Sequence, residues 1–346
     1  MEPAQSVSLI VPALNEERTI EAALRSLMTI DYRNYEVIAV NDRSEDATGE
    51  IMERVAAESN GRMRVIHISE LPARWLGKTH AMWRAAQESR AEWLLFTDAD
   101  VVFRPDALRR AVAYAKSERA DHLVLFPTME FKTFGEKMVL AFFSIMFAFG
   151  QKAWKVADPT TKDHVGMGAF NMVRRSVYEA IGTYERLRLA VIDDIKLGEV
   201  IKHSGYRQRV AMGYGLLSIH WAPGAFGILH GLTKNLFAQL RFNMFFAVVA
   251  SSAMLFVNLM PFVGVALAPG WAKAPFGLGL LVLLMIYASF RKTAPGIPWW
   301  MIVMHPVATV LMAYAVARST FVTLKNGGIT WRGTRYSLEE LREGMR

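Results

Sequence analysis

Three long stretches without a charged residue constrain the fold of this 346-residue chain more than any other feature. They cover residues 242–272, 274–290 and 293–317. Each is close to or longer than the roughly 17–25 residues with which an α-helix crosses a lipid bilayer. Because the stretches are apolar all round rather than along one face, we prefer membrane helices to the alternative of a soluble helical bundle.

Proline and tryptophan in this region fit the same interpretation. Pro261 lies inside the first stretch, and membrane helices tolerate proline better than soluble helices do. Trp271, Trp299 and Trp300 stand near the ends of the stretches, where aromatic residues meet a membrane interface. We therefore predict a membrane region at residues 226–330 with about three helices, near 242–267, 275–291 and 298–320.

The charges are distributed unevenly along the chain, which has a net charge of +8. Between Glu199 and Glu339 there is no Asp or Glu, whereas Lys and Arg recur. A basic region beside apolar stretches suits an anionic membrane surface, and the basic tail at 331–346 favours the cytoplasmic side. Three crossings would place that tail opposite the amino-terminal part, unless one stretch enters the membrane and returns. We expect no nucleic-acid partner, because the basic residues form no dense patch.

The amino-terminal part alternates between strand and helix patterns. Short apolar strands are predicted at Val7–Val11, Tyr35–Val40, Arg64–Ile68 and Trp93–Thr97, and helical patterns separate them. This alternation predicts an α/β fold with a mostly parallel sheet, whose ligands bind beyond the carboxyl ends of the strands. Those ends carry polar side chains at Asn15, Asp42, Asp98 and Asp100.

Asp98 and Asp100 directly follow the buried strand at Trp93–Thr97. Residues i and i+2 of an extended segment point to the same side, so both carboxylates can reach one cation. Two carboxylates with open positions left over suit Mg²⁺ or Mn²⁺ shared with a substrate phosphate. The alternative is a solvated Asp-Ala-Asp turn that only ends the strand.

Three further segments leave more than one interpretation open. Asp193 and Asp194 begin a predicted helix, where they could simply complement its dipole. The glycine-containing loop at 166–175 matches neither a P-loop nor the dinucleotide fingerprint, so we do not interpret it as a phosphate cradle. Residues 138–151 carry no charge but are short for a membrane crossing, so they form either a buried helix or one that lies in the interface.

Five segments resemble, in register, the family-2 glycosyltransferases, which have the GT-A fold and use nucleotide-sugar donors: Val11–Glu17, Val40–Thr48, Leu76–Lys78, Thr97–Asp100 and Asp193–Gly198. The resemblance covers about residues 7–215 and implies a GT-A catalytic domain at 1–225. The apolar last third is similar to membrane relatives that glycosylate lipids, such as ceramide glucosyltransferases and bacterial enzymes linked to hopanoids or carotenoids.

The resemblance also implies roles for individual residues. Nucleotide-sugar binding falls to Pro12, Asn15, Glu17, Asp42, Asp46, Lys78 and Asp98. A Mg²⁺ or Mn²⁺ ion would be held by Asp98 and Asp100, with His220 as a candidate third ligand, although a lone histidine is often structural. Asp194 would be the general base, and Asp193 replaces the glutamate of the family's Glu-Asp pair. The stretch Gln239–Phe242 departs from the Gln-x-x-Arg-Trp signature of polysaccharide synthases, which argues against a processive polymerase.

These expectations combine into one function. We expect an inverting, metal-dependent glycosyltransferase that moves a sugar from a nucleotide sugar, a UDP-sugar by resemblance, to a hydroxyl or carboxyl group of a lipid acceptor. The first six residues are polar and the following apolar run is too short for a secretory signal. We therefore expect a multi-pass protein of the cell membrane with its catalytic domain in the cytoplasm. The alternatives are a nucleotidyltransferase or a polyprenyl-phosphate glycosyltransferase on the same fold, or a membrane receptor without activity.

Overall fold

The computed structural model describes residues 5–294 and 296–344 and divides into two compact units. The first unit comprises the chain up to residue 129 together with residues 151–220. The second comprises residues 130–150 and the chain from residue 221 onward. The short segment 130–150 therefore belongs to the carboxyl-terminal unit although it is inserted into the amino-terminal one. The last two residues of the predicted basic tail lie outside the described residues.

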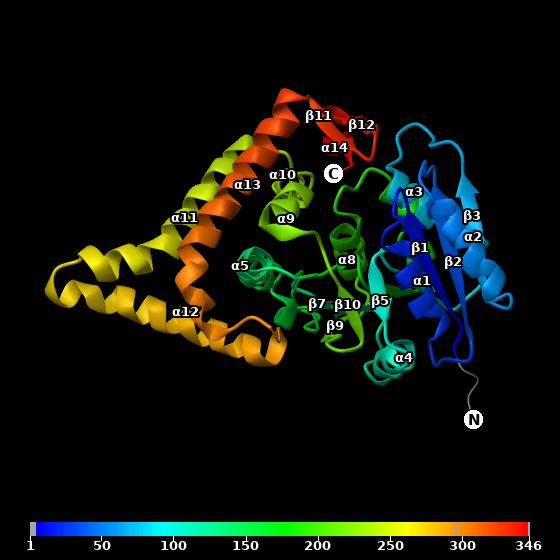
Figure 1. The fold of residues 1–346 in the computed structure, drawn as a ribbon, viewed down its shortest axis with the longest axis horizontal. Helices are drawn as coiled ribbons and strands as arrows, with labels where there is room; N and C mark the ends of the chain where they lie inside the picture. Colours follow the sequence, from blue (N-terminus) through cyan, green and yellow to red (C-terminus); the bar gives the residue numbers. More distant parts are fainter. Residues whose placement is uncertain (1–4, 295, 345–346) are drawn as a thin grey trace. The chain divides into compact units, whose positions relative to one another are not determined.

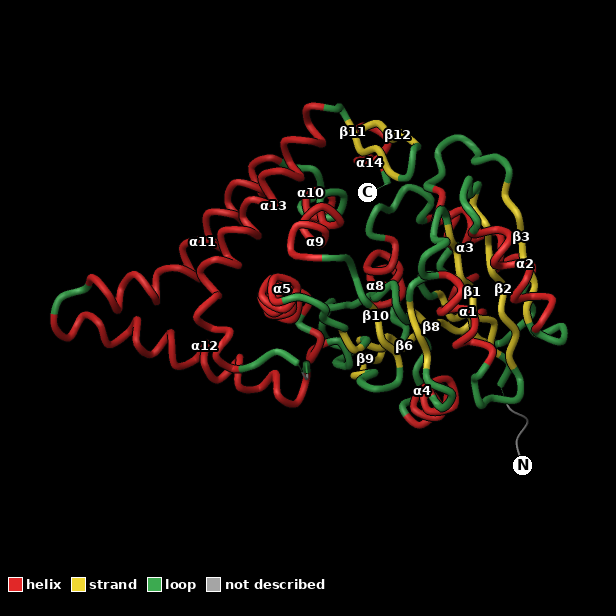
Figure 2. The backbone as a smooth tube through the Cα atoms, viewed as in Figure 1, coloured by secondary structure: helices red, strands yellow, loops and turns green. Residues whose placement is uncertain are grey.

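The first unit is built on a large mixed sheet (Figure 2). Its strand order is β3-β2-β1-β4-β8-β6-β9. The strands β1, β2, β3 and β4 are parallel, and β8 runs antiparallel to its neighbours β4 and β6. The bounds are β1 Val7–Ala13, β2 Tyr35–Asp42, β3 Met63–Ile68, β4 Trp93–Phe96, β6 His122–Phe126, β8 Asn171–Arg174 and β9 Gln208–Met212. The predicted α/β fold with a mostly parallel sheet is confirmed.

Helices cover both faces of this sheet, which explains why its central strands are apolar throughout. Alternate side chains of β1 point to opposite faces, so Val7 and Leu9 pack in one core and Ile10 in the other. The first core includes α1 (Ile20–Met28), α2 (Thr48–Glu58) and α4 (Ala107–Ser117). The second includes α3 (Gly77–Glu88), α6 (Arg175–Ala180), α7 (Thr183–Arg186) and α8 (Asp193–His203).

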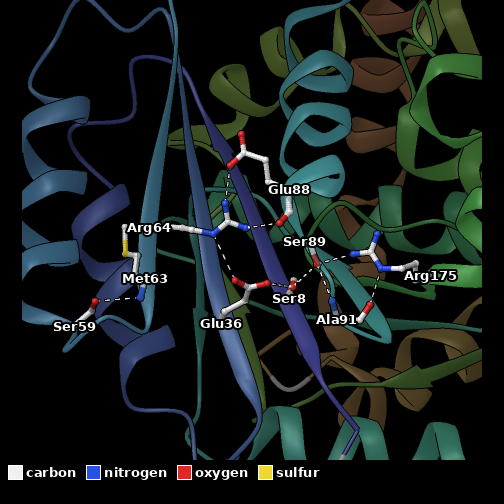
Figure 3. A network of polar contacts seen from close by, with 9 residues as sticks. All are labelled: Ser8, Glu36, Ser59, Met63, Arg64, Glu88, Ser89, Ala91 and Arg175. Atoms are coloured by element: carbon white, nitrogen blue, oxygen red, sulfur yellow. Dashed lines mark hydrogen bonds and ion pairs between the residues drawn. The ribbon is translucent and has the colours of Figure 1, made fainter.

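A polar network stabilises the amino ends of the parallel strands (Figure 3). The Ser8 hydroxyl donates a hydrogen bond to the Glu36 carboxylate across β1 and β2 (2.5 Å). Arg64 on β3 pairs with Glu88 at the end of α3 (2.6 Å) and lies 3.5 Å from Glu36. These contacts join the strands at the end of the sheet opposite the predicted acids, so the carboxyl ends remain available for a ligand.

A smaller sheet adjoins the acids that follow β4. It has the order β5-β10-β7, with bounds β5 Val101–Phe103, β7 Thr128–Met129 and β10 Leu217–Ile219. In the antiparallel pair β5 and β10, Ile219 stands opposite Val101. Continued by one residue, this register sets His220 across from Asp100.

The second unit contains the predicted membrane helices (Figure 1). Among the described residues, three helices are long and apolar enough to cross a membrane: Met244–Leu267, Gly270–Phe290 and Trp299–Lys325. They comprise α11 (Met244–Leu267), all but the last residues of α12 (Ala274–Thr293), and α13 (His305–Lys325), with short 3₁₀ turns at Gly270–Lys273 and Trp299–Met304. The unit is completed by α9 (Gly224–Leu232), α10 (Leu236–Gln239), β11 (Gly328–Trp331), β12 (Thr334–Ser337) and α14 (Leu338–Glu343).

The inserted segment forms α5 (Phe134–Gln151), which packs within the second unit. The ring of Phe142 is fully buried and lies 5.0 Å from the ring of His305. Near the start of α5, the Glu136 carboxylate accepts hydrogen bonds from the backbone N–H groups of Lys132 and Gly224 (2.7 Å each). These bonds outweigh the effect of burial and lower the pKa of Glu136 to about 2. The first half of α5 is mostly buried, whereas Phe149 near its end is 52% exposed. Packing of the first half is therefore observed, and a position in the membrane interface stays a prediction.

Candidate active site

A glycine-containing loop holds the first acid that follows β4. The Thr97 hydroxyl donates to the carbonyl of Ala169 (2.8 Å), and the Asp98 N–H donates to the carbonyl of Gly168 (3.0 Å). A Cβ atom at Gly168 would lie only 2.3 Å from a carboxylate oxygen of Asp98. Glycine is therefore required at this position, because any side chain would displace the acid.

Seven polar side chains line one small cavity: Lys78, Thr97, Asp98, Asn171, Tyr184, Asp193 and Asp194. Four of them, the lysine and the three acids, are site residues that the sequence predicts. They come from the first turn of α3, the end of β4 and the first turn of α8, which are far apart in the sequence. The structure thus brings the predicted donor-binding and catalytic residues of these elements together.

Lys78 is the cation of the cavity. Its ammonium group lies 2.7 Å from a carboxylate oxygen of Asp98 and 3.5 Å from one of Asp193. Burial lowers the pKa of Lys78, but the charges of Asp193, Asp98 and Asp194 outweigh it, so the pKa is raised overall. The lysine therefore stays charged at physiological pH, and the three carboxylates leave the cavity with an excess of negative charge.

Asp100 lies where the nearby acids outweigh the positive charge of Lys78. Its Oδ1 atom is buried and has no hydrogen-bond partner among the described residues. Burial, then the charges of Asp98 and Glu16, raise the pKa of Asp100 to about 7. An oxygen-binding cation suits such a group, so Asp98 and Asp100 fit a divalent ion. No group of three His, Asp or Glu side chains arranged to hold a metal occurs in the described ranges, so the role of His220 as third ligand stays a prediction.

The acids of α8 lie in its first turn, where the helix dipole favours negative charge. Asp193 is almost fully buried, whereas Asp194 is partly exposed. One carboxylate oxygen of Asp194 accepts a hydrogen bond from the N–H of Ile195 (2.8 Å). A Cβ atom at Gly166 would overlap the carbonyl of Asp194, at 1.7 Å. The glycine loop therefore approaches both α8 and the acid that follows β4.

A series of hydrogen bonds between buried polar side chains ends on the backbone of Asp194. The Gln208 amide donates to Nδ1 of His122 (2.7 Å), so this histidine carries its proton on Nε2 and donates it to the Asn171 amide oxygen. The Asn171 amide in turn donates to the backbone carbonyl of Asp194 (3.3 Å). Burial lowers the pKa of His122 to about 4, which keeps the ring neutral as this arrangement requires.

The sequence did not predict this series of hydrogen bonds. His122, Asn171 and Gln208 each occupy the first position of a strand, in β6, β8 and β9. A polar residue at the first position of each of three strands was the available signal. It could not be used, because the sequence does not reveal that β8, β6 and β9 are neighbours.

The loops that follow β1 and β2 are tied together and carry the residues predicted to bind the nucleoside. The Asn15 amide oxygen accepts a hydrogen bond from the N–H of Glu45 (2.8 Å), and the Glu17 N–H donates to the Asp46 carboxylate (3.1 Å). Hydrogen bonds from Thr48 and Glu17 outweigh burial and lower the pKa of Asp46. Asn15 and Glu17 are exposed, so both can contact a ligand.

Asp42 and Pro12 are placed differently from these loop residues. Asp42 is buried and forms a two-pronged ion pair with Arg43, at 2.8 and 3.0 Å. A Cβ atom at Gly77 would lie 2.3 Å from its carboxylate, so Asp42 touches the backbone directly before Lys78. Pro12 is buried within β1 opposite Val40, so its side chain faces the protein interior rather than an open pocket.

Comparison with known proteins identifies the family. Residues 8–182, half of the chain, match the model of glycosyl transferase family 2. This chain belongs to glycosyl transferase family 2. It is therefore a glycosyltransferase, and the alternatives of a nucleotidyltransferase and of an inactive receptor are set aside.

Two kinds of relatives cover nearly the whole glycosyltransferase. The 4,4'-diaponeurosporenoate glycosyltransferase of Staphylococcus aureus (strain bovine RF122 / ET3-1) is 23% identical over 342 residues, which are 97% of this chain and 89% of that protein. The protein of the same name from strain USA300 is 22% identical over 346 residues. A mannosyltransferase of Pyrobaculum calidifontis, solved in complex with GDP-Man and Mn²⁺, has a TM-score of 0.57 and 18% identity, with 90% of this chain and 88% of that chain covered. The fold of the glycosyltransferase is accordingly GT-A, followed by the apolar helices.

Proposed function

We propose that this glycosyltransferase moves a sugar from a UDP-sugar to a hydroxyl or carboxyl group of a lipid. The observation that carries the proposal is the cavity at the carboxyl end of β4, where Lys78 stands among Asp98, Asp193 and Asp194. Ligands of parallel α/β sheets bind at this end of the strands. The donor is water-soluble and the acceptor lies in the bilayer, which fits a catalytic unit in the same chain as three long apolar helices.

Asp98 and Asp100 would hold a Mg²⁺ or Mn²⁺ ion. The buried Oδ1 atom of Asp100 has no hydrogen-bond partner among the described residues, which supports this assignment. A divalent ion, when bound, offsets the negative charge that develops on the departing diphosphate. Lys78, fixed by Asp98 and Asp193, supplies a second positive charge on the same side. The solved mannosyltransferase, which contains Mn²⁺ beside GDP-Man, is consistent with this arrangement.

Nucleoside recognition would fall to the loops after β1 and β2. Asn15 and Glu17 are exposed on the first loop, and Asp46 fixes its position through the N–H of Glu17. Asp42, held by Arg43, would accept a hydrogen bond from the base. Pro12 would act through its backbone shape, because its side chain is buried. His220 would be the third ligand of the ion, because the register of β5 and β10 continues to a position opposite Asp100.

Asp194 would be the general base of a single displacement with inversion. A hydroxyl acceptor must lose its proton as it attacks, and a carboxylate within about 3 Å can take it. Asp193, buried beside Lys78, would orient the site rather than accept the proton. A carboxyl acceptor is already ionised near neutral pH, since carboxyl groups titrate at about 4. The need for Asp194 should therefore be larger for a hydroxyl acceptor than for a carboxylate.

The acceptor would be a lipid in the membrane that surrounds the second unit. The relatives named for diaponeurosporenoate, a carotenoid acid, support a long apolar acceptor with a carboxyl group. The region from Glu199 to Glu339 lacks acids, so the unit suits an anionic leaflet. We place the catalytic unit on the cytoplasmic side of the cell membrane, where nucleotide sugars are made.

A donor screen against membrane lipids tests the proposal. Membranes that contain the protein are incubated with Mn²⁺ and, separately, with UDP-glucose, UDP-N-acetylglucosamine and GDP-mannose, and the extracted lipids are analysed by mass spectrometry. We expect one lipid class to gain the mass of one sugar with a UDP-sugar. Product with GDP-mannose alone would contradict the choice of UDP, and release of free sugar without any lipid product would contradict the acceptor.

A further inference from the structure

Tyr184 presents a buried hydroxyl group for which the described residues provide no hydrogen-bond partner. The residue is fully buried, yet it lines the same cavity as Lys78, Asp98 and Asp194. A buried donor without a partner is destabilising, and native proteins keep few of them. A hydroxyl that reaches a ligand cavity without a partner is suited to form its hydrogen bond with the ligand.

The surrounding structure fixes the direction of this hydroxyl. The Tyr184 ring packs edge-on against the ring of Phe96, with 4.9 Å between the ring centroids. The backbone N–H of Tyr184 donates to the hydroxyl of Tyr178 (3.1 Å). The turn before it places Gly182 at φ +91° and Thr183 at φ +55°. A β-branched residue in the left-handed region is strained, and such strain persists where the surroundings impose it, often at functional sites. The chain therefore maintains an unfavourable turn that sets Tyr184 at the cavity.

The charges of the cavity indicate which part of the donor it holds. Asp98, Asp193 and Asp194 outnumber the single ammonium group of Lys78, so a diphosphate fits beside this cavity only where the proposed ion offsets the excess negative charge. A hydroxyl group of a sugar ring suits this small cavity, because it can donate to the carboxylates. Such a ring also offers oxygens that accept from Tyr184. Burial and then Asp193 raise the pKa of Tyr184 well above its usual range, so its O–H remains a donor.

We propose that Tyr184 binds the transferred sugar, with its hydroxyl donating to a ring or hydroxyl oxygen of that sugar. The inference rests on the proposed function and divides the donor between two places in the first unit. A hydroxyl group of the sugar enters the cavity beside Tyr184, and the nucleoside occupies the loops after β1 and β2. Tyr184 thereby contributes to the discrimination between sugars rather than to nucleotide affinity.

The experiment compares wild-type protein with Tyr184→Phe, which removes only the hydroxyl. Each purified protein is titrated by calorimetry in Mn²⁺ with UDP, UDP-glucose and UDP-N-acetylglucosamine. We expect the affinity for UDP to stay within about twofold and the affinity for at least one UDP-sugar to fall by about 5- to 15-fold, the effect of one lost hydrogen bond. The melting temperature of the ligand-free variant should not fall, because the hydroxyl has no partner among residues 5–294 and 296–344.

Tyr178→Phe is the matched control. It removes a hydroxyl that does accept a hydrogen bond, from the N–H of Tyr184, so the melting temperature should fall by a few degrees. The ratio of UDP-sugar to UDP affinity should stay near that of wild type. Unchanged affinity of Tyr184→Phe for both UDP-sugars, or a melting temperature lowered as in Tyr178→Phe, would overturn the inference. If wild-type protein binds neither UDP nor a UDP-sugar, the proposed function itself fails.

Discussion

Each unit of the molecule contains a buried histidine with a partner on both ring nitrogens, and the two differ in what they connect. In the first unit, His122 lies between Gln208 and Asn171, and this chain ends on the backbone of Asp194. In the second unit, the ring of His305 lies 3.1 Å from the Tyr287 hydroxyl and 3.0 Å from the Asn258 amide. The first set leads to an acid of the active site, whereas the second joins α11, α12 and α13 to one another.

The two units also differ in where they place their apolar side chains. The first unit buries its apolar side chains, as a water-soluble domain does. The long helices of the second unit expose theirs, with Leu267 79% and Trp271 88% exposed, and keep the polar His305 inside. This distribution is expected when lipid replaces water around a helix bundle, because polar side chains then link helices to one another. Substitutions in the His122 set should therefore change catalysis, whereas substitutions in the His305 set should change only stability.

The largest effect is expected at the proposed ligands of the metal ion. Asp100→Ala removes a carboxylate of the proposed metal pair, so transfer should fall on the order of 10²–10³-fold or more, together with Mn²⁺ affinity. Activity assays and calorimetric Mn²⁺ titration measure the two losses. Asp31→Ala is the control, because the carboxylate of this exposed acid lies on the surface, where it pairs with Arg109. Mn²⁺ affinity equal to that of wild type would remove Asp100 from the site.

The pH dependence of stability should reveal the neutral state of His122. Its pKa is lowered to about 4 from an ordinary value of 6.5, so the unfolded chain binds this proton more tightly than the folded protein. Stability should therefore be complete above about pH 6.5 and decrease by about 3 kcal/mol as the pH falls toward 4.

The variant to compare in this measurement is His122→Gln. Its side-chain amide is polar, as the imidazole ring is, but it does not titrate. Melting curves at pH 7 and pH 4.5 should show a smaller loss for the variant than for wild type. Equal losses for both proteins would mean that His122 is charged, or exposed, in the folded state.

Asn171→Leu tests whether the first set acts on catalysis. The substitution leaves His122 without its acceptor and releases the carbonyl of Asp194, which should cost about 1–3 kcal/mol of stability. Transfer should lose about 10- to 100-fold in kcat, with a change in the donor KM of less than about threefold. A variant that is less stable but fully active at low temperature would reduce this set to a purely structural role.

His305→Leu is expected to have the smallest effect and completes the comparison. Hydrogen bonds between membrane helices contribute about 0.6–2 kcal/mol each, so the variant should unfold slightly earlier in detergent. Its kcat and its affinity for UDP should stay within about twofold of wild type. A loss of kcat as large as that of Asn171→Leu would abolish the distinction between the two sets.

Local patterns in the sequence predict a large part of this structure. The apolar run before Asp98 forms β4, and the charge-free stretches form the three long helices, because strand alternation and helix length are properties of contiguous residues. Asp98, predicted from its place after β4, lines the cavity, whereas Asp42 and Asp100 are not among the lining residues.

Features that depend on which strands are neighbours were not predictable. His122, Asn171 and Gln208 form one chain only because β8, β6 and β9 are adjacent in the sheet. The sequence showed only that the loop at 166–175 has no phosphate-binding motif. In the structure, Gly168 of this loop lets the backbone approach the Asp98 carboxylate closely. Residues 130–150 belong to the second unit because α5 packs against its helices, a contact between segments that are distant along the chain.

The most direct test of the account follows one labelled sugar in matched membranes. Membranes with wild-type protein or with Asp194→Asn receive a ¹³C-labelled UDP-sugar and Mn²⁺, and the labelled lipid is measured by mass spectrometry. The account predicts labelled lipid with wild type and a loss of about 10²-fold or more with the variant for a hydroxyl acceptor, while donor binding survives. Equal labelling by both proteins, or no labelled lipid with any UDP-sugar, would contradict it.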